Sequence, residues 1–373
     1  MAEFSADLRV GRDIKLPQPT RDQLDAAPDA ARDPLDLLRA AARTGLDGVL
    51  VRTIVELSPT LDAGLLGDAR ALADELGLYL HVGVGKVNPY MTAELPEVRD
   101  LGAGDYTAGM VRMIEAAAAI GCHELWTATA FQKPPSYGVH AVDRFRTDVT
   151  WPEQLRATTA YLHRLAPILR ANGSRLDIET HEEITAAELL AMIEEVGGDV
   201  VGVTFDPANS VARGEDPHEV ASLLAPHIHL THLRDVALFP HGPDLIRYLA
   251  PCGDGVLDWP RLLGTLLDSS PGLHLTIEGS GAHRGRLVIP RADPRWLRDR
   301  GAPPTAATDP LDTMLAGYTA RVCAGEVPGH AVFERAAADP AAAGELGDID
   351  TFVARAADAL RIATRRISAG LRA

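Results

Sequence analysis

Four short segments of the chain each end an apolar run on a residue type that binds metal ions. They are LDIETH (176–181), VGVTFDPAN (201–209), IHLTHLRD (228–235) and LTIEGSG (275–281). The candidate ligands in them are Glu179, Asp206, His232 and Glu278. Three carboxylates and one imidazole favour Mn²⁺, Mg²⁺ or Co²⁺ over a thiolate-type zinc site. The sequence therefore predicts a divalent-cation site.

A divalent ion held in this way polarises a carbonyl or a pair of hydroxyls and stabilises an enediolate. Glu179 and Glu278, on either side of the ion, can exchange a proton between neighbouring carbons. The chemistry predicted is proton abstraction next to a carbonyl. Structural alternatives remain at this stage, because either glutamate could pair with an arginine, and Asp206 followed by Pro207 is also a good helix N-cap.

The four ligands are spaced by 27, 26 and 46 residues, and the first two spacings match one strand, helix and loop. Eight apolar segments, alternating with helical ones, predict the strands of a parallel sheet. These lie at 8–14, 48–54, 78–84, 123–129, 175–180, 200–205, 228–233 and 273–278. Eight is the number that a closed (β/α)8 TIM barrel needs, and such a barrel points the ends of its strands at one central site.

Helix signals fill the intervals between the strands. Thr150 with Glu153 and Thr185 with Glu188 form capping boxes at the start of two helices. Residues 236–258 are expected to form a loop after the seventh strand, and 131–150 a long loop after the fourth. We expect a barrel over 1–285 and, over 286–373, a Pro/Ala-rich excursion followed by C-terminal helices near 309–325 and 350–368. One of those helices could close the barrel, and the rest could pack on the barrel or on another subunit.

Composition narrows the class of protein. The 373 residues carry 36 basic and 52 acidic side chains, a net charge of −16, which argues against binding to nucleic acid over a broad surface. The three cysteines form no CxxC pair, there is no run of 18 apolar residues, and the N-terminus does not read as a signal peptide. We expect a cytoplasmic protein that does not cross a membrane.

A second group of polar residues surrounds the predicted ligands. His181 lies two positions after Glu179 and is a candidate general base near neutral pH, or else a residue that hydrogen-bonds the next loop. Asn209 and Asp235 could bind substrate or orient the site. His229 and His232 are three positions apart, so on a regular strand they face opposite sides, and we favour His232 as the ligand. The remaining candidates, which could hold substrate oxygens from strand ends, are Lys86, Arg213 and Arg234.

Taken in order, these motifs resemble the xylose isomerase-like TIM barrel superfamily, and more narrowly the sugar phosphate isomerases and epimerases. The motifs are ExH at 179–181, FDPAN at 205–209, HLRD at 232–235, CGDGVLDW at 252–259 and a last strand ending in Glu278. The resemblance covers roughly 1–285. It implies a divalent metal, often Mn²⁺, at Glu179, Asp206, His232 and Glu278, with the two glutamates as paired acid and base. Keto-sugar 3-epimerases carry a histidine where this chain has Asn209.

A second branch of the superfamily fits the chain length, the ExH pair and the C-terminal extension. The chain is similar to the barrel subunit of C-glycoside deglycosidases, which are lyases on 3-oxo-glycosides that use a metal and a histidine base, here His181. Those enzymes work with a small β-rich partner subunit, and a homo-oligomer is the other expectation. An abasic-site endonuclease of the same fold is disfavoured, because strand four ends in WTATA without a histidine and the charge is wrong for DNA.

Overall fold

The computed structural model describes residues 8–14, 33–92, 95–131, 143–279, 285–300, 309–339, 344 and 346–370. Its main sheet has eight parallel strands in the order β10-β1-β2-β3-β4-β5-β6-β7. Each of them lies within one of the eight segments that the sequence predicts. The strands are β1 Val10–Ile14, β2 Gly48–Val51, β3 Tyr79–Gly83, β4 Glu124–Thr127, β5 Arg175–Glu179, β6 Val201–Phe205, β7 Ile228–Thr231 and β10 Leu275–Ile277.

The two edges of the sheet meet and close it into a barrel. Just past the end of β7, Leu233 forms a parallel bridge with Ile277 of β10. The Leu233 backbone N–H donates to the Thr276 carbonyl at 2.7 Å, and the Glu278 N–H donates to the Leu233 carbonyl at 3.2 Å. These bonds confirm the predicted (β/α)8 TIM barrel and bring the ends of β7 and β10 side by side.

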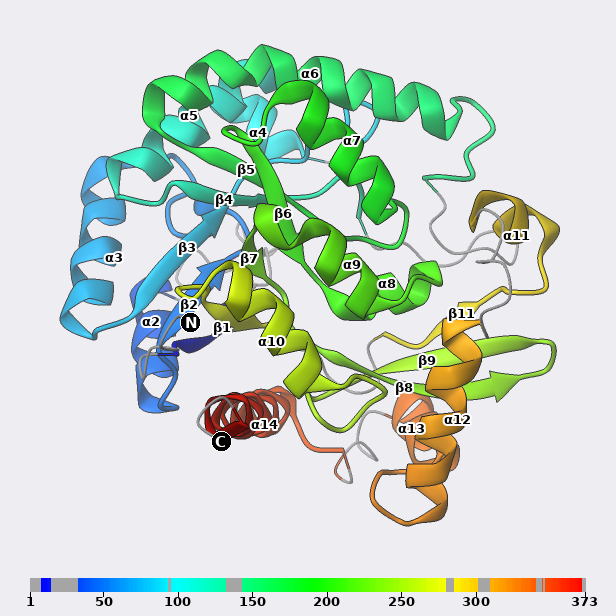
Figure 1. The fold of residues 1–373 in the computed structure, drawn as a ribbon. Coiled ribbons are helices and arrows are strands. Elements are labelled where there is room, and N and C mark those ends of the chain that lie inside the picture. The colour runs from blue at the N-terminus through cyan, green and yellow to red at the C-terminus, as the bar shows by residue number, and fades with distance from the viewer. Residues whose placement is uncertain are drawn as a thin grey trace.

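Helices cover the outside of the barrel (Figure 1). Both predicted capping boxes are present, at the starts of α6 and α7. The helices that follow β1 to β7 are α2 Pro34–Arg43, α3 Ala63–Glu75, α4 Pro96–Leu101, α5 Tyr106–Ala119, α6 Trp151–Asn172, α7 Ala186–Val196, α8 Pro207–Arg213, α9 Pro217–Leu224 and α10 Trp259–Ser269, with 3-10 turns at Ile54–Glu56 and Ala225–His227. The C-terminal helix α14 Ile349–Gly370 packs on α10, β1 and β10, where it supplies the eighth helix.

A separate antiparallel sheet departs from the sequence-based expectation. Residues 236–250 of the segment 236–258, which we expected to be a loop, belong to a hairpin of β8 Asp235–His241 and β9 Asp244–Ala250. A third strand, β11 Leu287–Ile289, pairs with β9 inside the segment expected to be irregular. The sequence of the hairpin shows no alternation of polar and apolar residues, because both of its faces are covered. One face packs on the barrel core and the other on the C-terminal helices.

The C-terminal segment holds more regular structure than its composition suggests. It contains α11 Pro294–Arg300, α12 Pro310–Cys323 and α13 His330–Ala338. Helices α12 and α13 pack against β8 and β9 through a cluster that includes Phe239, Tyr248, Tyr318 and Phe333 (Figure 1). This cluster anchors the hairpin beside the barrel and so fixes what the hairpin can present to the site.

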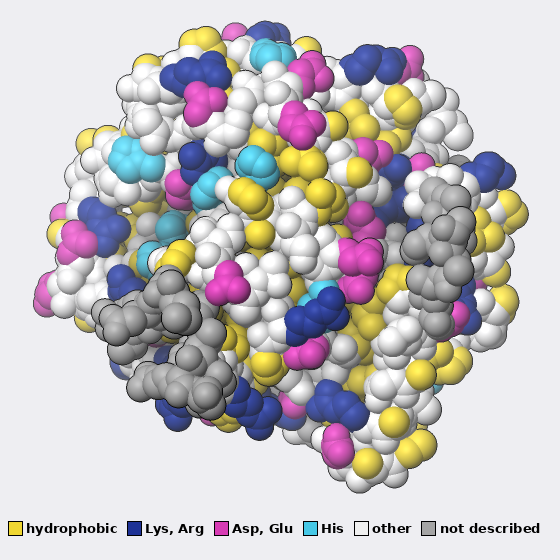
Figure 2. Space-filling view, viewed as in Figure 1, with side chains coloured by type: hydrophobic (Ala, Val, Ile, Leu, Met, Phe, Trp, Pro, Cys, Tyr) yellow, Lys and Arg dark blue, Asp and Glu magenta, His cyan; other side chains and the backbone are white. Residues whose placement is uncertain are grey.

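Within the described ranges, no helix is both long and apolar enough to cross a membrane. On the face drawn in Figure 2, acidic and basic side chains are interspersed with hydrophobic ones, so this face carries no large patch of a single sign.

Candidate active site

Three of the four predicted metal ligands meet at the carboxyl ends of the strands. Glu179 ends β5, while His232 and Glu278 directly follow β7 and β10. All three are buried, and one ligand atom from each lies within 4.8 Å of the other two. His232 Nδ1 is 3.3 Å from Glu179 Oε1 and 3.9 Å from Glu278 Oε2. The barrel thus brings together residues that are up to 99 positions apart in the sequence.

A β-bulge in β7 sets the direction of His229, and of His232 directly after the strand. The register between β6 and β7 shifts after Val203, so that Ile228 and Leu230 pair with consecutive residues of β6. The extra residue, His229, reaches Asp177, which is two positions before Glu179 on β5. Both His229 and His232 therefore face partners on β5, and the expectation that they face opposite sides is wrong, because a bulge shifts the alternation by one residue.

The donor set of the cluster fits a divalent cation. His232 Nε2 is buried and has no hydrogen-bond partner among the described residues. Glu278 Oε2 lies 3.0 Å from Arg234 Nη2, but without the geometry of a hydrogen bond. A buried acceptor atom left in this state costs free energy that a bound cation would recover. Two carboxylates and an imidazole are ligands that Mn²⁺ accepts.

Asp206, the fourth predicted ligand, makes other contacts. It is the N-cap of α8, and its Oδ1 accepts from the backbone N–H of Ala208 at 2.9 Å and of Asn209 at 3.3 Å. Its Oδ2 accepts from Arg234 Nε at 2.9 Å and Nη2 at 2.5 Å. Although burial raises the pKa of Asp206, Arg234 opposes that shift. Of the two roles that the sequence left open for Asp206, helix cap or metal ligand, the structure shows the cap, and Asp206 lies beside the ligand cluster.

Two arginines hold Glu278 from opposite sides, and sequence reasoning missed one of them. Arg52, just after β2, contacts Glu278 Oε1 and also donates to Asp13 Oδ2 at 3.0 Å. Arg234 contacts Glu278 Oε2 and Asp206. The signal for Arg52 was its position at a strand end, the same signal that singled out Arg234. The two guanidiniums balance carboxylates that would otherwise repel one another in the barrel mouth.

Glu179 is held by neutral donors as well as by the histidine. Trp126 Nε1 donates to Glu179 Oε2 at 3.1 Å, and Asn209 Nδ2 donates to Oε1 at 3.4 Å. Burial alone would raise the pKa of Glu179, but His232, His181 and Arg52 hold it below its usual range. Glu179 is therefore ionised, which suits a metal ligand better than a proton acceptor.

His181 lies at the mouth of the barrel between two glutamates that sequence reasoning did not single out. Its Nδ1 contacts Glu183 Oε2, and its Nε2 lies 3.5 Å from Glu182 Oε2. Glu183 is itself fixed, because its Oε1 accepts from Thr129 Oγ1 at 2.5 Å. Burial alone would lower the pKa of His181, but Glu183 and Glu182 raise it to about 9. The two glutamates thus favour the protonated form of the ring over the neutral one.

Two excursions from the barrel border this histidine. Arg247 of β9 is buried and donates to Glu182 Oε1 at 2.5 Å. Arg144 donates to the Glu183 carbonyl at 2.7 Å and ion-pairs with Glu188 at 2.8 Å. Arg144 belongs to the segment 131–150, of which 132–142 lies outside the described residues. The hairpin and the described part of this segment both reach the predicted site, as their positions after strands seven and four suggested.

Of the three remaining predicted residues, only one lies near the ligand cluster. Lys86 is buried with its Nζ 4.2 Å from the ring centre of Trp126, the residue that donates to Glu179. Asp235 accepts from Trp259 Nε1 at 2.8 Å and from three backbone N–H groups, and so holds the turn before α10. Arg213 ion-pairs with Asp299 of α11 at 2.9 Å. Lys86 lies near the cluster, whereas the contacts of Asp235 and Arg213 are with other segments.

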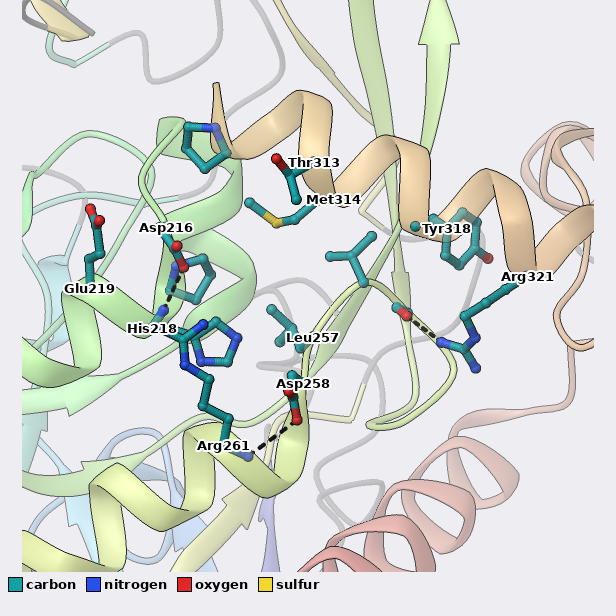
Figure 3. Close-up of a pocket in the computed structure, with 15 residues that line it drawn as sticks. Asp216, His218, Glu219, Leu257, Asp258, Arg261, Thr313, Met314, Tyr318 and Arg321 are labelled. Atoms are coloured by element: carbon teal, nitrogen blue, oxygen red, sulfur yellow. Dashed lines mark hydrogen bonds between the residues drawn. The ribbon is translucent and has the colours of Figure 1, made fainter. Parts of the chain in front are cut away.

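A separate pocket lies between the barrel and α12. Its volume is about 500 Å³, and it is lined by the N-terminal ends of α9 and α10, the loop 255–258 and one face of α12 (Figure 3). Asp216 and Asp258 in its wall cap those two helices, and Arg321 donates to the Gly255 carbonyl at 2.5 Å. None of the predicted site residues lines this pocket, and two of its three acidic groups, Asp216 and Asp258, already cap helices.

The fold and the cluster agree with the family to which the sequence is matched. The chain belongs to the family described as xylose isomerase-like TIM barrel, whose profile matches residues 38–300. This confirms the superfamily that the motifs predict.

Individual relatives are more distant. The chain is 27% identical over 121 residues to 3-oxo-isoapionate decarboxylase from Pectobacterium atrosepticum, a match that spans 32% of this chain and 44% of that protein. The structure is similar to 3-keto-D-glucoside 4-epimerase from E. coli, with a TM-score of 0.52, 14% identity and coverage of 82% and 98%. It is also similar to D-psicose 3-epimerase from Clostridium cellulolyticum H10, with a TM-score of 0.52, 14% identity and coverage of 86% and 100%. At these identities the two structures support the fold alone.

Proposed function

We propose that this protein is a divalent-metal-dependent isomerase or epimerase that moves a proton beside the carbonyl of a keto-sugar or sugar phosphate. The observation that carries the proposal is the buried convergence of Glu179, His232 and Glu278 within 4.8 Å of one another. The family assignment agrees with it, as do solved structures of the same fold whose names describe them as sugar epimerases.

Glu179, His232 and Glu278 would hold the ion, with Asp206 as a fourth ligand if Arg234 gives it up. Bound there, a divalent ion would polarise the carbonyl oxygen of a substrate and favour negative charge on it. Mn²⁺ is the first candidate and Mg²⁺ or Co²⁺ the others. Because Glu278 is held on both sides by guanidiniums, its carboxylate enters the reaction with a fixed orientation.

His181 would deliver or accept the proton at the open side of the site. Its contact with Glu183 through Nδ1 leaves Nε2 as the atom that reacts, since Nδ1 is committed to a buried carboxylate. Asn209, whose Nδ2 reaches Glu179, and Lys86, which lies over Trp126, would bind substrate oxygens. Arg213 and Asp235 would contribute through the segments that they hold, rather than by touching substrate.

A second candidate is a metal-dependent lyase acting on a 3-oxo substrate, as in the C-glycoside deglycosidase branch. The specific observation in its favour is the pair of His181 and Glu183, which provides a proton-transfer group separate from the two glutamate ligands. The match to a protein named 3-oxo-isoapionate decarboxylase points to the same substrate type, although it covers only a third of the chain. In this reading a bond next to the carbonyl breaks, instead of a stereocentre changing.

The experiment that tests both candidates follows exchange with solvent. Metal-free protein is loaded with Mn²⁺ in D₂O and incubated with a panel of ketoses, ketose phosphates and 3-oxo-glycosides, and products are analysed by NMR. Deuterium beside the carbonyl with an inverted or shifted centre supports the isomerase or epimerase. Release of an aglycone or of CO₂ supports the lyase. If no substrate exchanges and none is converted, while the Mn²⁺ is bound, the proposed chemistry is contradicted.

Four further expectations from the sequence stay predictions. They are a boundary near residue 285 between the barrel and the C-terminal segment, a homo-oligomeric state, a small β-rich partner subunit and a cytoplasmic location.

A further inference from the structure

A second group of ligand-type side chains lies inside the barrel, toward the amino-terminal ends of the strands. Glu124 is the first residue of β4, Asp177 is the third of β5 and His229 is the second of β7. One ligand atom from each lies within 4.8 Å of the other two. Asp177 and Glu179 are two positions apart on β5, so they share a face of the strand but lie about 7 Å apart along it. The two groups are therefore stacked along the barrel.

Asp177 is the buried centre of this second group. It is 0% exposed, and its Oδ1 lies 2.8 Å from His229 Nδ1. Its Oδ2 is also buried and has no hydrogen-bond partner within the part of the chain that the structure describes. A buried, unpaired carboxylate oxygen costs several kcal/mol unless something positive reaches it. The open side of Asp177 thus calls either for a bound cation or for a proton shared with Glu124.

The neighbouring cation does not supply that charge. Arg175 donates to both carboxylate oxygens of Glu124, at 3.0 and 3.3 Å, and to the Gly198 carbonyl. Arg175 is therefore hydrogen-bonded to Glu124 and not to Asp177.

The backbone around the group makes room for it. A Cβ atom on Gly202 of β6 would lie 2.2 Å from Asp177 Oδ1 and 2.4 Å from His229 Nδ1. Any other residue at position 202 would separate these two side chains. The bulge that turns His229 toward Asp177 lies on the adjoining strand pair. A glycine and a bulge, both unfavourable in an undisturbed strand, are placed where they bring the two donors together.

We propose that Glu124, Asp177 and His229 form a second divalent-cation site, separate from the ligand cluster at the other end of the barrel. Two carboxylates and one imidazole are a donor set for zinc or manganese, with water completing the coordination. The site does not depend on the function proposed above. Because it ties together β4, β5 and β7, its role is structural. The competing explanation is a single proton shared between Asp177 and Glu124.

The test counts bound metal in matched variants. Chelator-treated protein is titrated with Zn²⁺ by calorimetry, and the bound metal is measured after gel filtration. The wild type should bind two equivalents, and Asp177→Asn and Glu278→Gln should each bind one, from opposite ends of the barrel. The double variant should bind none. His229→Gln removes a ligand and should weaken the binding of the same equivalent that Asp177→Asn removes, by at least about tenfold. His274→Gln, at the same end of the barrel but hydrogen-bonded to His81, is the control and should keep both.

Either of two results would overturn the proposal. One is a wild type that binds a single equivalent, which Glu278→Gln removes. The other is an Asp177→Asn variant that keeps both. Asparagine has the shape of a protonated aspartate and can replace it without loss of stability. In both cases, an unchanged melting temperature for Asp177→Asn would therefore favour a proton shared between Asp177 and Glu124 over a bound cation.

Discussion

Arg234 is hydrogen-bonded to Asp206 through two of its guanidinium nitrogens, Nε at 2.9 Å and Nη2 at 2.5 Å. Nη2 also lies 3.0 Å from Glu278 Oε2. The guanidinium thus connects the strand end that carries one predicted ligand to the strand end that carries another. The Arg234 guanidinium thus supplies positive charge to both carboxylates, as a metal ion at this place would.

Removing Arg234 should destabilise the protein. Arg234→Met leaves Asp206 buried without its cation, and breaking a buried pair from one side costs about 3–5 kcal/mol in free energy of unfolding. The double variant Arg234→Met with Asp206→Asn removes both charges and should recover most of that loss. Denaturant unfolding of the metal-free protein measures both. Equal stability of the wild type and Arg234→Met would mean that the pair is solvated and not part of the core.

The ligand cluster predicts loss of metal from a single neutral substitution. Glu278→Gln removes a charge and a strong donor, so most of the Mn²⁺ and most of the activity should be lost together. Glu219→Gln, on the exposed side of α9, is the control and should bind metal normally. Elemental analysis after dialysis gives the stoichiometry. Full metal content with full turnover in Glu278→Gln would remove Glu278 from the site.

The pairing of His181 with Glu183 predicts how the two candidate reactions respond to mutation. If His181 transfers the essential proton, His181→Ala should lower kcat by about 10²–10⁴-fold. Because Glu183 holds the ring, Glu183→Gln should lower kcat by a comparable factor, and the double variant should cost little more than either single one. Glu194→Gln on the exposed face of α7 is the control.

The substrate decides what that result means. Near wild-type epimerisation of a ketose by His181→Ala would indicate that Glu179 and Glu278 move the protons, and it would count against the lyase. If the wild type releases an aglycone from a 3-oxo-glycoside and His181→Ala loses that activity, the result would count against the epimerase.

Two histidines at the amino-terminal end of the barrel predict sensitivity to acid. His81 Nε2 and His274 Nδ1 are 2.8 Å apart, and burial lowers the pKa of His81 to about 3 and of His274 to about 4. The unfolded chain binds protons at these groups near pH 6.5, and the folded protein does not. Stability should therefore fall as the pH is lowered from 6.5 toward 4, by about 1.4 kcal/mol per pH unit for each group.

Replacing one of the pair measures this effect. In His81→Gln, the slope of the free energy of unfolding against pH should be smaller by about one proton over that range. Parallel slopes for the variant and the wild type would show that His81 is protonated in the folded state. Denaturant unfolding at several pH values supplies both curves.

The sequence by itself determined the barrel and the kinds of atoms in the site. The eight strands are buried on both faces, so their apolar runs are recognisable without any knowledge of their partners. The positions of Glu179, His232 and Glu278 at strand ends follow from the same runs, because parallel strands of a barrel end at one mouth. The capping boxes at Thr150 and Thr185 were equally local signals.

Only the tertiary structure decided how those residues are paired. Whether Asp206 only caps a helix, pairs with an arginine or binds an ion depends on Arg234, 28 residues away, and no local pattern encodes that choice. The bulge at His229 depends on how β6 and β7 align. The hairpin that carries Arg247 is covered on both faces by distant helices, which removes the alternation that would have revealed it. Contacts between distant segments set each of these features, because buried charges find their partners in space and not along the chain.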